Sequence, residues 1–430
     1  MSLIVMKFGG TSVGDTDRIK NAASKVAAEI RRGNKVVVVV SAMAGVTDKL
    51  IADCRAVSPH CDQRELDAVV ATGEQVTAGL MAIALKQLGH NARSWQGWQV
   101  GLMTDTAYGK ARILDIEVEP LRRSVEDGEV GVVAGFQGIT KDGRISTLGR
   151  GGSDTSAVAL AVALKADRCD IYTDVDGVYT TDPNVVAKAR KVDRIAYEEM
   201  LELASLGAKV LQVRSVEMAM KYGMKLQVLS TFANEIGSDL PGTLVTEEDN
   251  MMEKNDVTGI AYTRDEAQIT LVKVADRPGV AAAIFEPLAA AGISVDMIVQ
   301  SASDDGRATD VTFTVSKGDF DSSVKILEDE KNKIGYSDIL SAKNVAKLSL
   351  VGVGMRNHVG VAATMFKTLA DNGINIKAIQ TSEITASVLI DEKYLELALR
   401  ALHSAHGLDA IERSTHANSP HNRSQSWLGA

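Results

Sequence analysis

Short apolar runs and segments with helical spacing alternate along the first 230 residues of the chain. The apolar runs predict strands over residues 3–8, 35–41, 129–136, 170–173 and 225–229. Apolar positions three and four apart predict helices over residues 13–32, 73–88, 153–165 and 207–220. The run 35–41 holds five consecutive valines, which is typical of a strand buried on both faces. The alternation predicts an α/β fold with an open, mainly parallel sheet sandwiched by helices.

The final third of the chain contains one pattern twice. Residues 271–280 are echoed by residues 350–361, and Gly279 and Phe285 have counterparts 81 positions later in Gly360 and Phe366. Each copy predicts a strand, a helix, two strands and a second helix. A period of about 80 residues is too long for a solenoid unit and indicates two small tandem domains.

Between the two patterns, residues 235–255 show no clear periodicity and contain Gly237, Pro241 and Gly242, which is typical of an exposed link. The polar residues from Thr415 onward predict a disordered tail. We therefore expect five parts, at residues 1–235, a link at 236–256, two small domains at 257–342 and 343–412, and a tail at 413–430.

Composition narrows the class of protein without naming a function. The 430 residues carry 47 Lys and Arg against 56 Asp and Glu, for a net charge of −9, and the acidity is spread evenly, which argues against a nucleic-acid partner. The chain has no apolar run of about 18 residues to span a membrane and no secretory signal pattern at its start. Its three cysteines form no CxxC pair, which argues against a disulfide framework or a zinc site. We expect a cytoplasmic protein without a membrane partner.

A glycine-rich turn follows the first predicted strand. That strand delivers Lys7 at its carboxyl end, and Gly9 and Gly10 allow a ligand to approach the backbone closely. Thr11, Ser12 and the start of the next predicted helix add hydroxyl and N–H donors, so the turn predicts a phosphate site. The alternative is an ordinary glycine turn with a surface lysine. The chain lacks GxxxxGK[ST] and a helix-opening GxGxxG, which disfavours a P-loop or a dinucleotide site.

Three further segments carry candidate binding groups. Ser41 and Thr47 follow the valine-rich strand, where small polar residues line the crevice of parallel sheets, although Thr47 also suits a helix cap. Glu74 at a helix start is either a favourable charge at the helix dipole or a partner for a substrate ammonium group. Arg150 can grip a carboxylate with two hydrogen bonds, and Asp154 either caps the next helix or meets Lys7.

Residues 172–183 are rich in turn formers, and their aspartates with Tyr179 could enclose a purine and its ribose, although a bare turn has the same composition. Lys209 offers one more cation for a phosphate. Basic residues, glycines and helix N-termini together suit phosphoryl transfer, in which the protein mainly positions groups and neutralises charge.

The strings KFGGTSV, SAMAGVTD, ATGE, GRGGSDT and YTDVDGVYTTDP occur in this order over residues 7–183. They resemble the aspartate kinases of the amino-acid-kinase superfamily, and the repeated pattern resembles the paired ACT regulatory domains of that family. The resemblance covers about residues 1–410. It implies an amino-acid-kinase-like sheet followed by two ferredoxin-like (βαββαβ) domains, in a monofunctional enzyme that makes 4-phospho-L-aspartate from L-aspartate and ATP. This is the first step of the pathway to lysine, threonine and methionine.

The resemblance also implies residue roles. Lys7 and Asp154 would be catalytic, and Mg²⁺ would be held by the nucleotide and not by a dedicated protein site. The residues implied for the nucleotide are Lys7, Phe8, Gly9, Gly10, Ser41, Thr173, Asp174, Tyr179, Asp182 and Lys209. Those implied for aspartate are Thr47, Glu74, Arg150, Gly151, Gly152 and Ser153. The family commonly has a basic residue where this chain has Asn184, which puts one phosphate contact in doubt.

The paired domains imply feedback inhibition by lysine, threonine or both. The effector residues implied are Asp276, Ile293, Ser294, Val295 and Gln300 in the first copy, and Val361, Asn375, Ile376, Ser382 and Glu383 in the second. ACT pairing implies a homo-oligomer, or an α2β2 assembly with a short subunit from an internal start near Met251 or Met252. Two alternatives are a superfamily kinase for another acid and a non-catalytic amino-acid sensor. Glu74 and Arg150 together disfavour the first, and Lys7, Arg150 and Asp154 disfavour the second.

Overall fold

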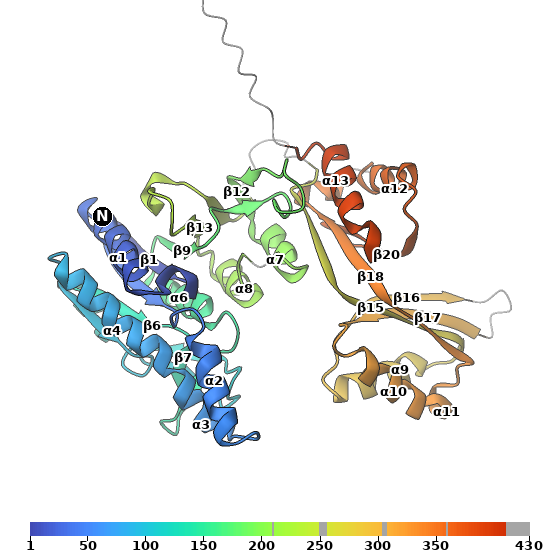
Figure 1. Cartoon of the computed structure of the whole chain (residues 1–430), viewed down its shortest axis with the longest axis horizontal. Coiled ribbons are helices and arrows are strands. Elements are labelled where there is room, and N and C mark those ends of the chain that lie inside the picture. Colours follow the sequence, from blue (N-terminus) through green and yellow to red (C-terminus); the bar gives the residue numbers. More distant parts are fainter. Residues whose placement is uncertain (209, 249–255, 303–307, 358–359, 410–430) are drawn as a thin grey trace, which may run out of the picture.

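The computed structural model describes residues 1–208, 210–248, 256–302, 308–357 and 360–409, and the chain forms two halves (Figure 1). The first half is a sheet covered by helices, and the second half, from Gly259 onward, is built on a separate sheet. Lys209, Met251, Met252 and the expected tail over 413–430 lie outside the described residues.

The first sheet has eight strands in the order β12-β14-β13-β9-β1-β2-β6-β3. Their bounds are β1 (Leu3–Phe8), β2 (Lys35–Val40), β3 (Ala92–Trp95), β6 (Val130–Ala134), β9 (Arg168–Thr173), β12 (Arg194–Ala196), β13 (Leu226–Ser230) and β14 (Thr243–Thr246). Every neighbouring pair is parallel except β13 with β14. The predicted mainly parallel sheet is confirmed.

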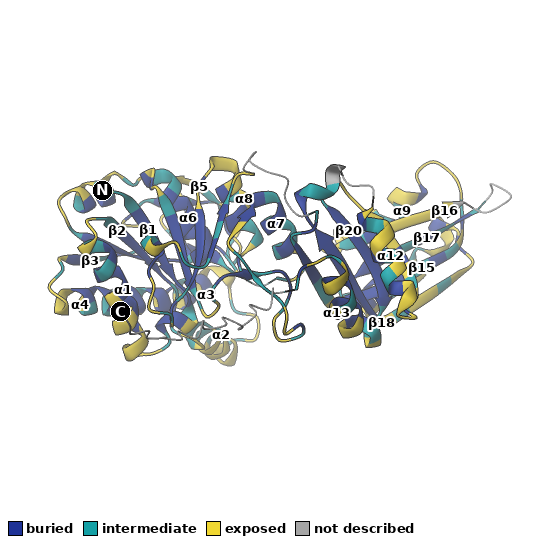
Figure 2. Ribbon diagram, turned by 90° about the horizontal axis from the view of Figure 1, so that it is seen from above, coloured by how far each residue is buried: buried dark blue, intermediate teal, exposed yellow. Residues whose placement is uncertain are grey.

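Helices cover both faces of this sheet. One face packs against α1 (Thr16–Arg31) and α4 (Thr72–Gln87), and the other against α5 (Glu119–Glu126), α6 (Gly152–Leu164), α7 (Tyr197–Ser205) and α8 (Val213–Tyr222). Side chains alternate along β2, so Val38 and Val40 join the cluster with α1 and α4 while Val37 and Val39 join the other. Burial on both faces therefore explains the run of valines, and Figure 2 shows the central strands and α6 as buried.

The chain also forms elements that its apolar spacing did not predict. Besides β3, β12, β14, α5 and α7, they include α2 (Val46–Val57), α3 (Gln63–Val70) and a small sheet of β4 (Leu102–Thr104), β5 (Ile113–Ile116), β7 (Gln137–Ile139) and β8 (Ile145–Thr147). Helix α2 has no buried residue, so its sequence carries no core-facing stripe. The helix expected over 207–220 begins instead at Val213 and ends at Tyr222. Gly207 takes a φ of 117°, and a side chain there would meet the Tyr262 carbonyl.

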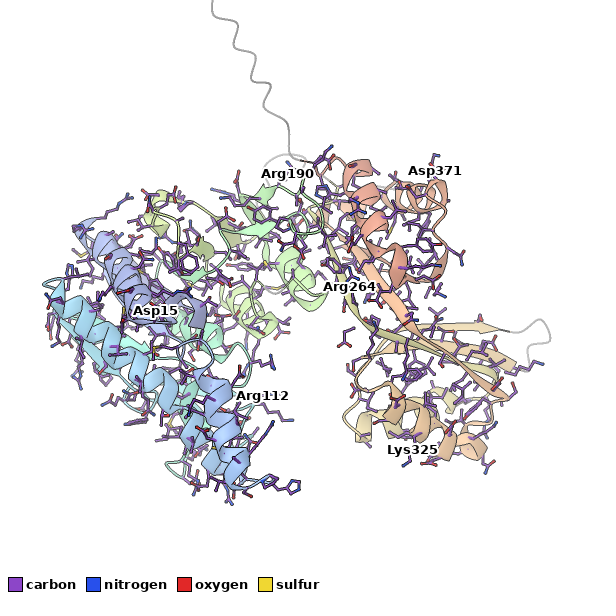
Figure 3. All side chains as sticks on the ribbon, in the orientation of Figure 1. Asp15, Arg112, Arg190, Arg264, Lys325 and Asp371 are labelled. Atoms are coloured by element: carbon purple, nitrogen blue, oxygen red, sulfur yellow. The ribbon has the colours of Figure 1, made fainter. Side chains whose placement is uncertain are left out.

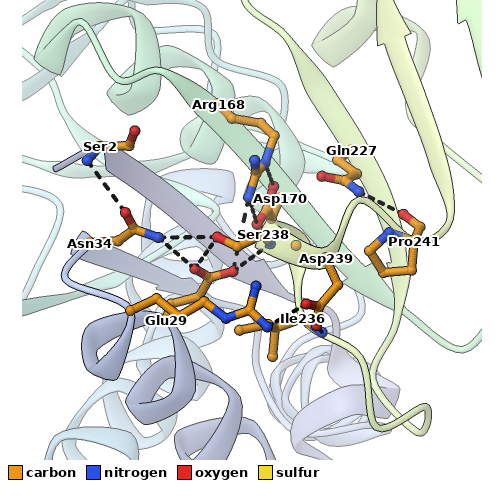
Figure 4. Close-up of polar contacts among 12 residues, drawn as sticks. Ser2, Glu29, Asn34, Arg168, Asp170, Gln227, Ile236, Ser238, Asp239 and Pro241 are labelled. Atoms are coloured by element: carbon orange, nitrogen blue, oxygen red, sulfur yellow. Dashed lines mark hydrogen bonds and ion pairs between the residues drawn. The ribbon is translucent and has the colours of Figure 1, made fainter.

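The first part of the expected link 236–256 belongs to the first half. Residues 243–246 form β14 inside the sheet, and Ser238 donates hydrogen bonds from its amide and hydroxyl to the buried carboxylate of Glu29 at 2.8 and 2.5 Å (Figure 4). Beside it, Arg168 pairs with buried Asp170 at 2.5 Å, and burial raises the pKa of Asp170 to about 6. Polar contacts hold this segment against the first half. Because apolar side chains do not hold it there, the apolar pattern of the sequence does not predict its position.

The second sheet has the strand order β16-β17-β15-β18-β20-β19. Its strands are β15 (Gly259–Ala275), β16 (Val295–Ala302), β17 (Ala308–Val315), β18 (Asp338–Val351), β19 (Ile376–Thr381) and β20 (Thr385–Asp391). Its helices are α9 (Val280–Ala290), α10 (Phe320–Asp329), α11 (Lys331–Ile334), α12 (Val361–Asp371) and α13 (Leu395–Ala405).

The long strands β15 and β18 run through both copies of the repeat. The later part of β15 pairs with β17 in the first copy, whereas residues 259–263 pair with residues 347–351 of β18 in the second. Each copy thus has the four-stranded, helix-backed arrangement that was predicted. The fourth strand of the second copy, however, comes from residues that precede the first copy, an order that a repeat at a fixed offset does not reveal.

One described helical stretch, Gln63–Gln87, is long and apolar enough to cross a membrane by length and composition alone. Half of its most apolar window is buried inside the protein, and core helices of globular proteins have the same properties. It comprises α3 and α4, and α4 packs on the first sheet.

Candidate active site

A cavity of about 480 Å³ lies at the carboxyl ends of β1, β2 and β6. Loops after these strands, α2, α3 and the first turns of α4 and α6 form its walls. The residues nominated from the sequence that line it are Lys7, Gly10, Ser41, Thr47, Glu74, Arg150, Gly151, Gly152, Ser153 and Asp154. Parallel strands end at the same edge of a sheet, and this edge is where open α/β folds bind ligands.

Lys7 and Asp154 form a buried ion pair in the cavity wall. The Lys7 Nζ lies 2.5 Å from Asp154 Oδ1, and each residue is only 8% exposed. Lys7 is the last residue but one of β1, and Asp154 lies in the first turn of α6. Of the two roles expected for Asp154, the structure shows the contact with Lys7, whereas no side chain caps the start of α6. The pair places a fixed ammonium group at the cavity.

The glycine turn after β1 is held by its neighbours. The Gly9 amide donates to the Tyr172 carbonyl at 3.1 Å, and a side chain on Gly10 would lie 3.0 Å from the Ala42 carbonyl. The turn leads into a short 3-10 helix, η1 (Gly10–Val13), and α1 begins only at Thr16. The N–H groups closest to the glycines therefore belong to η1. The start of the next long helix, α1, does not lie directly at the glycines, although its N–H groups had been expected to bind a phosphate there.

Glu74 is a buried carboxyl group with one free oxygen. Its Oε1 accepts a hydrogen bond from the Ala42 amide at 2.9 Å, and Oε2 has no partner among the described residues. The side chain lines the cavity and is 3% exposed. Burial raises the pKa of Glu74 to about 7. A donor on a ligand, above all a cationic one, would both satisfy Oε2 and favour the ionised form.

Arg150 lines the cavity from a short loop, residues 149–151, that is called the arm below and has a glycine on either side of Arg150. Gly149 and Gly151 on either side of it take φ values of 80° and 68°, which glycine adopts at low cost. A side chain on Gly151 would overlap Gln212, at 1.8 Å from its Cγ. The Arg150 side chain is exposed, and over the part of the chain that the structure describes its guanidinium makes no hydrogen bond or ion pair. It is therefore available to an anionic ligand.

Asp67 on α3 is a wall residue that the sequence did not nominate. Its buried carboxylate accepts hydrogen bonds from the Gly109 amide at 2.8 Å, the Thr147 amide at 2.7 Å and the Thr147 hydroxyl at 3.0 Å. Arg214 holds the same two segments from the other side, by donating to the Ala111 and Leu148 carbonyls at 2.9 and 3.1 Å. The arm that carries Arg150 is thus tied at its base. A lone acidic residue in a helix gives no sequence signal for such contacts.

Phe136 is a second wall residue that was missed. It takes a φ of 68°, an uncommon conformation for a residue with a side chain, at the end of the strand that leads to the cavity. Its amide donates to Ser156 Oγ of α6 at 3.0 Å. An aromatic residue after a strand has no sequence feature that marks a left-handed backbone.

The residues nominated for the nucleotide's base and ribose lie outside the cavity. Thr173 ends β9, which is the neighbour of β1, and Asp174 follows it. Tyr179 lies in a hairpin of β10 (Val178–Tyr179) and β11 (Lys191–Val192), and its hydroxyl donates to Asp176 at 3.0 Å. Asp182 accepts from the Asn184 amide and side chain and from the Tyr262 hydroxyl of β15. Phe8 is buried in the core, and Lys209 lies outside the described residues.

The residues nominated for an effector lie near two strands of the second sheet. Ile293 and Ser294 precede β16, and Asn375 precedes β19. Asp276 follows β15, and the other nominated residues lie in β16 or β19, in the turn after β19 or at the start of α12. Although β16 and β19 are at opposite ends of the strand order, Met297 and Ala378 from them pack in one buried cluster. The fold therefore brings the two nominated sets toward each other.

Comparison with known proteins assigns both halves. Residues 2–230 match the amino acid kinase family, and residues 268–332 and 348–406 each match an ACT domain. The aspartate kinase Ask_LysC of Stutzerimonas stutzeri (strain A1501) is 54% identical over 416 residues, which cover 96% of this chain and 100% of that protein.

Solved structures agree with the whole-chain likeness. The crystal structure of E. coli aspartokinase III in complex with aspartate and ADP is 26% identical with a TM-score of 0.77, over 94% of this chain and 99% of that chain. Its complex with lysine and aspartate is 27% identical with a TM-score of 0.73 over the same shares. The chain belongs to the amino acid kinase family, within which it is an aspartate kinase with two ACT domains.

Proposed function

We propose that the cavity at the ends of β1, β2 and β6 is where this aspartate kinase phosphorylates its substrate. The observation that carries the proposal is the arrangement of Lys7, Glu74 and Arg150 around one space of about 480 Å³. An amino acid with a second carboxylate needs a partner for its ammonium group and a bidentate partner for a carboxylate. The unpartnered oxygen of Glu74 and the free guanidinium of Arg150 suit these two needs.

In the proposed reaction, an oxygen of the aspartate side-chain carboxylate attacks the γ-phosphorus of ATP. The new bond joins that oxygen to phosphorus, the bond from phosphorus to the β,γ-bridging oxygen breaks, and ADP leaves. The attacking carboxylate is already ionised at neutral pH, so no general base is required. Lys7, held by Asp154, stabilises the charge on the transferred group, as cations do in phosphoryl transfer. Thr47, Gly151, Gly152 and Ser153 shape the aspartate site.

The nucleotide is proposed to lie beside this cavity, against the end of β9 and the β10–β11 hairpin. Gly9, Gly10 and Ser41 would hold the phosphates, and Thr173, Asp174, Tyr179 and Asp182 the ribose and base. Phe8 and Lys209 complete the nominated set. Mg²⁺ is proposed to be carried mainly by the ATP phosphates, as it usually is in such sites.

We further propose that residues 1–235, together with strand β14 from the expected link at 236–256, form the catalytic domain, and that the ACT domains at 257–342 and 343–412 bind lysine or threonine. The crystal structure of E. coli aspartokinase III with lysine supports an amino-acid effector. The nominated residues near β16 and β19 are the proposed effector site. Such control suits the first step of a pathway that ends in these amino acids.

The assembly is proposed to be a homo-oligomer through the ACT domains, or an α2β2 complex with a short subunit started near Met251. An enzyme that uses ATP and aspartate suits the cytoplasm. Mass spectrometry of the product, made in a host from the native coding sequence, tests the short subunit, and detection of only the full-length chain would refute it.

The aspartate site is tested by the Arg150→Ala variant. Loss of the bidentate contact should raise the KM for aspartate about 10- to 100-fold and leave the KM for ATP near its original value. Aspartate-dependent release of ADP in a coupled assay measures both constants. Arg144→Ala, which removes an exposed arginine paired with Glu65, is the matched control. An unchanged KM for aspartate in Arg150→Ala would reject the proposed site.

A further inference from the structure

The β10–β11 hairpin of the catalytic half is held by contacts from the regulatory half. The Ile260 amide of β15 donates to the Thr180 carbonyl at 2.7 Å, and the Tyr262 hydroxyl donates to Asp182 at 3.0 Å. His403 of α13 lies 2.8 Å from the Thr180 hydroxyl through its Nε2. Arg190, in the return segment of the hairpin, is labelled at this junction in Figure 3.

His403 is the centre of a buried hydrogen-bonded chain with one consistent direction. The Arg190 amide donates to Thr180 Oγ1 at 3.1 Å, so the hydroxyl hydrogen of Thr180 is left to donate to His403 Nε2. His403 Nδ1 then donates to Asp409 Oδ1 at 2.8 Å. Every group in the chain thus has a partner, and the tautomer of His403 follows from the donors on either side.

The burial of this hydrogen-bonded chain limits the roles that it can have. Thr180 is 1% exposed and His403 is 0% exposed, so the Thr–His–Asp order does not present a nucleophile to a substrate. A buried polar chain with every member satisfied instead fixes the segments that it joins. It joins the hairpin, which carries Tyr179 and Asp182, to the last helix of the second ACT domain.

The position of Thr180 sets the position of its neighbours. Thr180 points into the interface with α13, while the adjacent Tyr179 contacts Asp176 on the catalytic half. Asp182 keeps one oxygen on Asn184 and the other on Tyr262. Asp182 thus contacts the regulatory half directly, and Tyr179 is one residue away from such a contact.

We propose that His403 and Tyr262, although they belong to the regulatory half, are positioning residues for ATP, because they hold the hairpin that carries Tyr179 and Asp182. The inference rests on the proposed assignment of this hairpin to the nucleotide. Neither residue touches the aspartate cavity. The regulatory half therefore acts on the affinity for ATP even when no effector is bound.

The test is the steady-state kinetics of the full-length His403→Leu and Tyr262→Phe variants. Each change removes a polar contact with little change in volume, so the KM for ATP should rise about three- to tenfold. The KM for aspartate and kcat at saturating substrates should stay near those of the original chain. Tyr336→Phe is the matched control, since it removes a buried hydroxyl that donates to the Leu327 carbonyl in the first ACT domain. It should leave the KM for ATP unchanged.

A Tyr179→Ala variant separates the two levels of the proposal. If the KM for ATP is unchanged in Tyr179→Ala, the assignment of the hairpin to the nucleotide is wrong. If it rises in Tyr179→Ala but not in His403→Leu or Tyr262→Phe, the hairpin binds ATP and the positioning role is refuted. Should His403→Leu fail to fold, Tyr262→Phe decides alone, because its hydroxyl contact is only partly buried.

Discussion

At the scale of single residues, the cavity combines charged groups whose environments differ. Lys7 and Asp154 neutralise each other. Within the described part of the chain, exposed Arg150 has no polar partner, and buried Glu74 has one oxygen without a partner. Burying a carboxylate without a counter-charge favours its protonated form, which is why the pKa of Glu74 lies near 7. A ligand that brings an ammonium group would reverse this balance.

The pH dependence of aspartate use should report Glu74. Its pKa of about 7 means that, in the free enzyme, the Glu74 carboxyl becomes increasingly protonated as the pH falls below neutral. Since the ammonium group needs the ionised form, kcat/KM for aspartate should fall about tenfold per unit as the pH drops below 7. In Glu74→Gln the value should be lower and this ionisation should be missing. A wild-type profile that stays flat between pH 5.5 and 8 would contradict the assigned role.

At the scale of elements, the arm that carries Arg150 depends on α3 and α8. Asp67 accepts from Gly109 and Thr147, and Arg214 donates to the carbonyls of Ala111 and Leu148, so two neighbouring segments are clamped from both sides. The glycines at 149 and 151 make the arm itself easily deformed. Its stiffness must therefore come from its base.

An Asp67→Asn variant should loosen this base. The amide of asparagine would present a donor to the Gly109 or Thr147 donors, so the KM for aspartate should rise about tenfold while the KM for ATP stays constant. Glu65→Gln on the same helix, which loses only a surface pair with Arg144, serves as the control. Steady-state kinetics with each substrate varied makes the comparison. Equal effects on both KM values would indicate general destabilisation.

The elements divide into those with a sequence signal and those without one. Strands β1, β2, β6, β9 and β13 and helices α1, α4 and α6 follow apolar periodicity, whereas β3, β12 and β14 were not predicted, and the glycine motifs place Lys7 and Arg150 at the cavity. Helix α2, without a buried face, and the segment before β14, which is fixed by Glu29, carry no apolar pattern. Asp67 and Phe136 were not foreseeable, because their roles depend on partners distant in sequence and on a left-handed backbone.

At the scale of the whole molecule, charge and regulation are arranged in space. The chain carries a net charge of −9, whereas Lys7 and Arg150 put two cationic side chains in the lining of the cavity. The ACT half meets the catalytic half at Glu199, which accepts from Thr258 and from the Val353 amide at 2.6 and 3.1 Å. The residues just before β15 and just after β18 thus contact one catalytic helix, α7.

Feedback control should appear as a loss of rate when effectors bind. Lysine, threonine or the two together should lower the rate at subsaturating ATP more than at saturating ATP, if the hairpin contacts carry the coupling. Initial rates with each amino acid alone and then with both measure this. Rates that no combination alters would refute the proposed effector site near β16 and β19.

The central claim is that Lys7 in this cavity assists transfer of the γ-phosphoryl group to the side chain of aspartate. The most direct measurement is the amount of aspartyl phosphate, trapped as its hydroxamate, that the wild type and Lys7→Met form from ATP and aspartate. Circular dichroism and a melting curve check that the variant is folded, because the loss of the Lys7 ammonium group leaves the buried Asp154 without its ion-pair partner. The account predicts aspartate-dependent product from the wild type and a rate at least about 100-fold lower from folded Lys7→Met. A folded Lys7→Met that forms the product at the wild-type rate would contradict it.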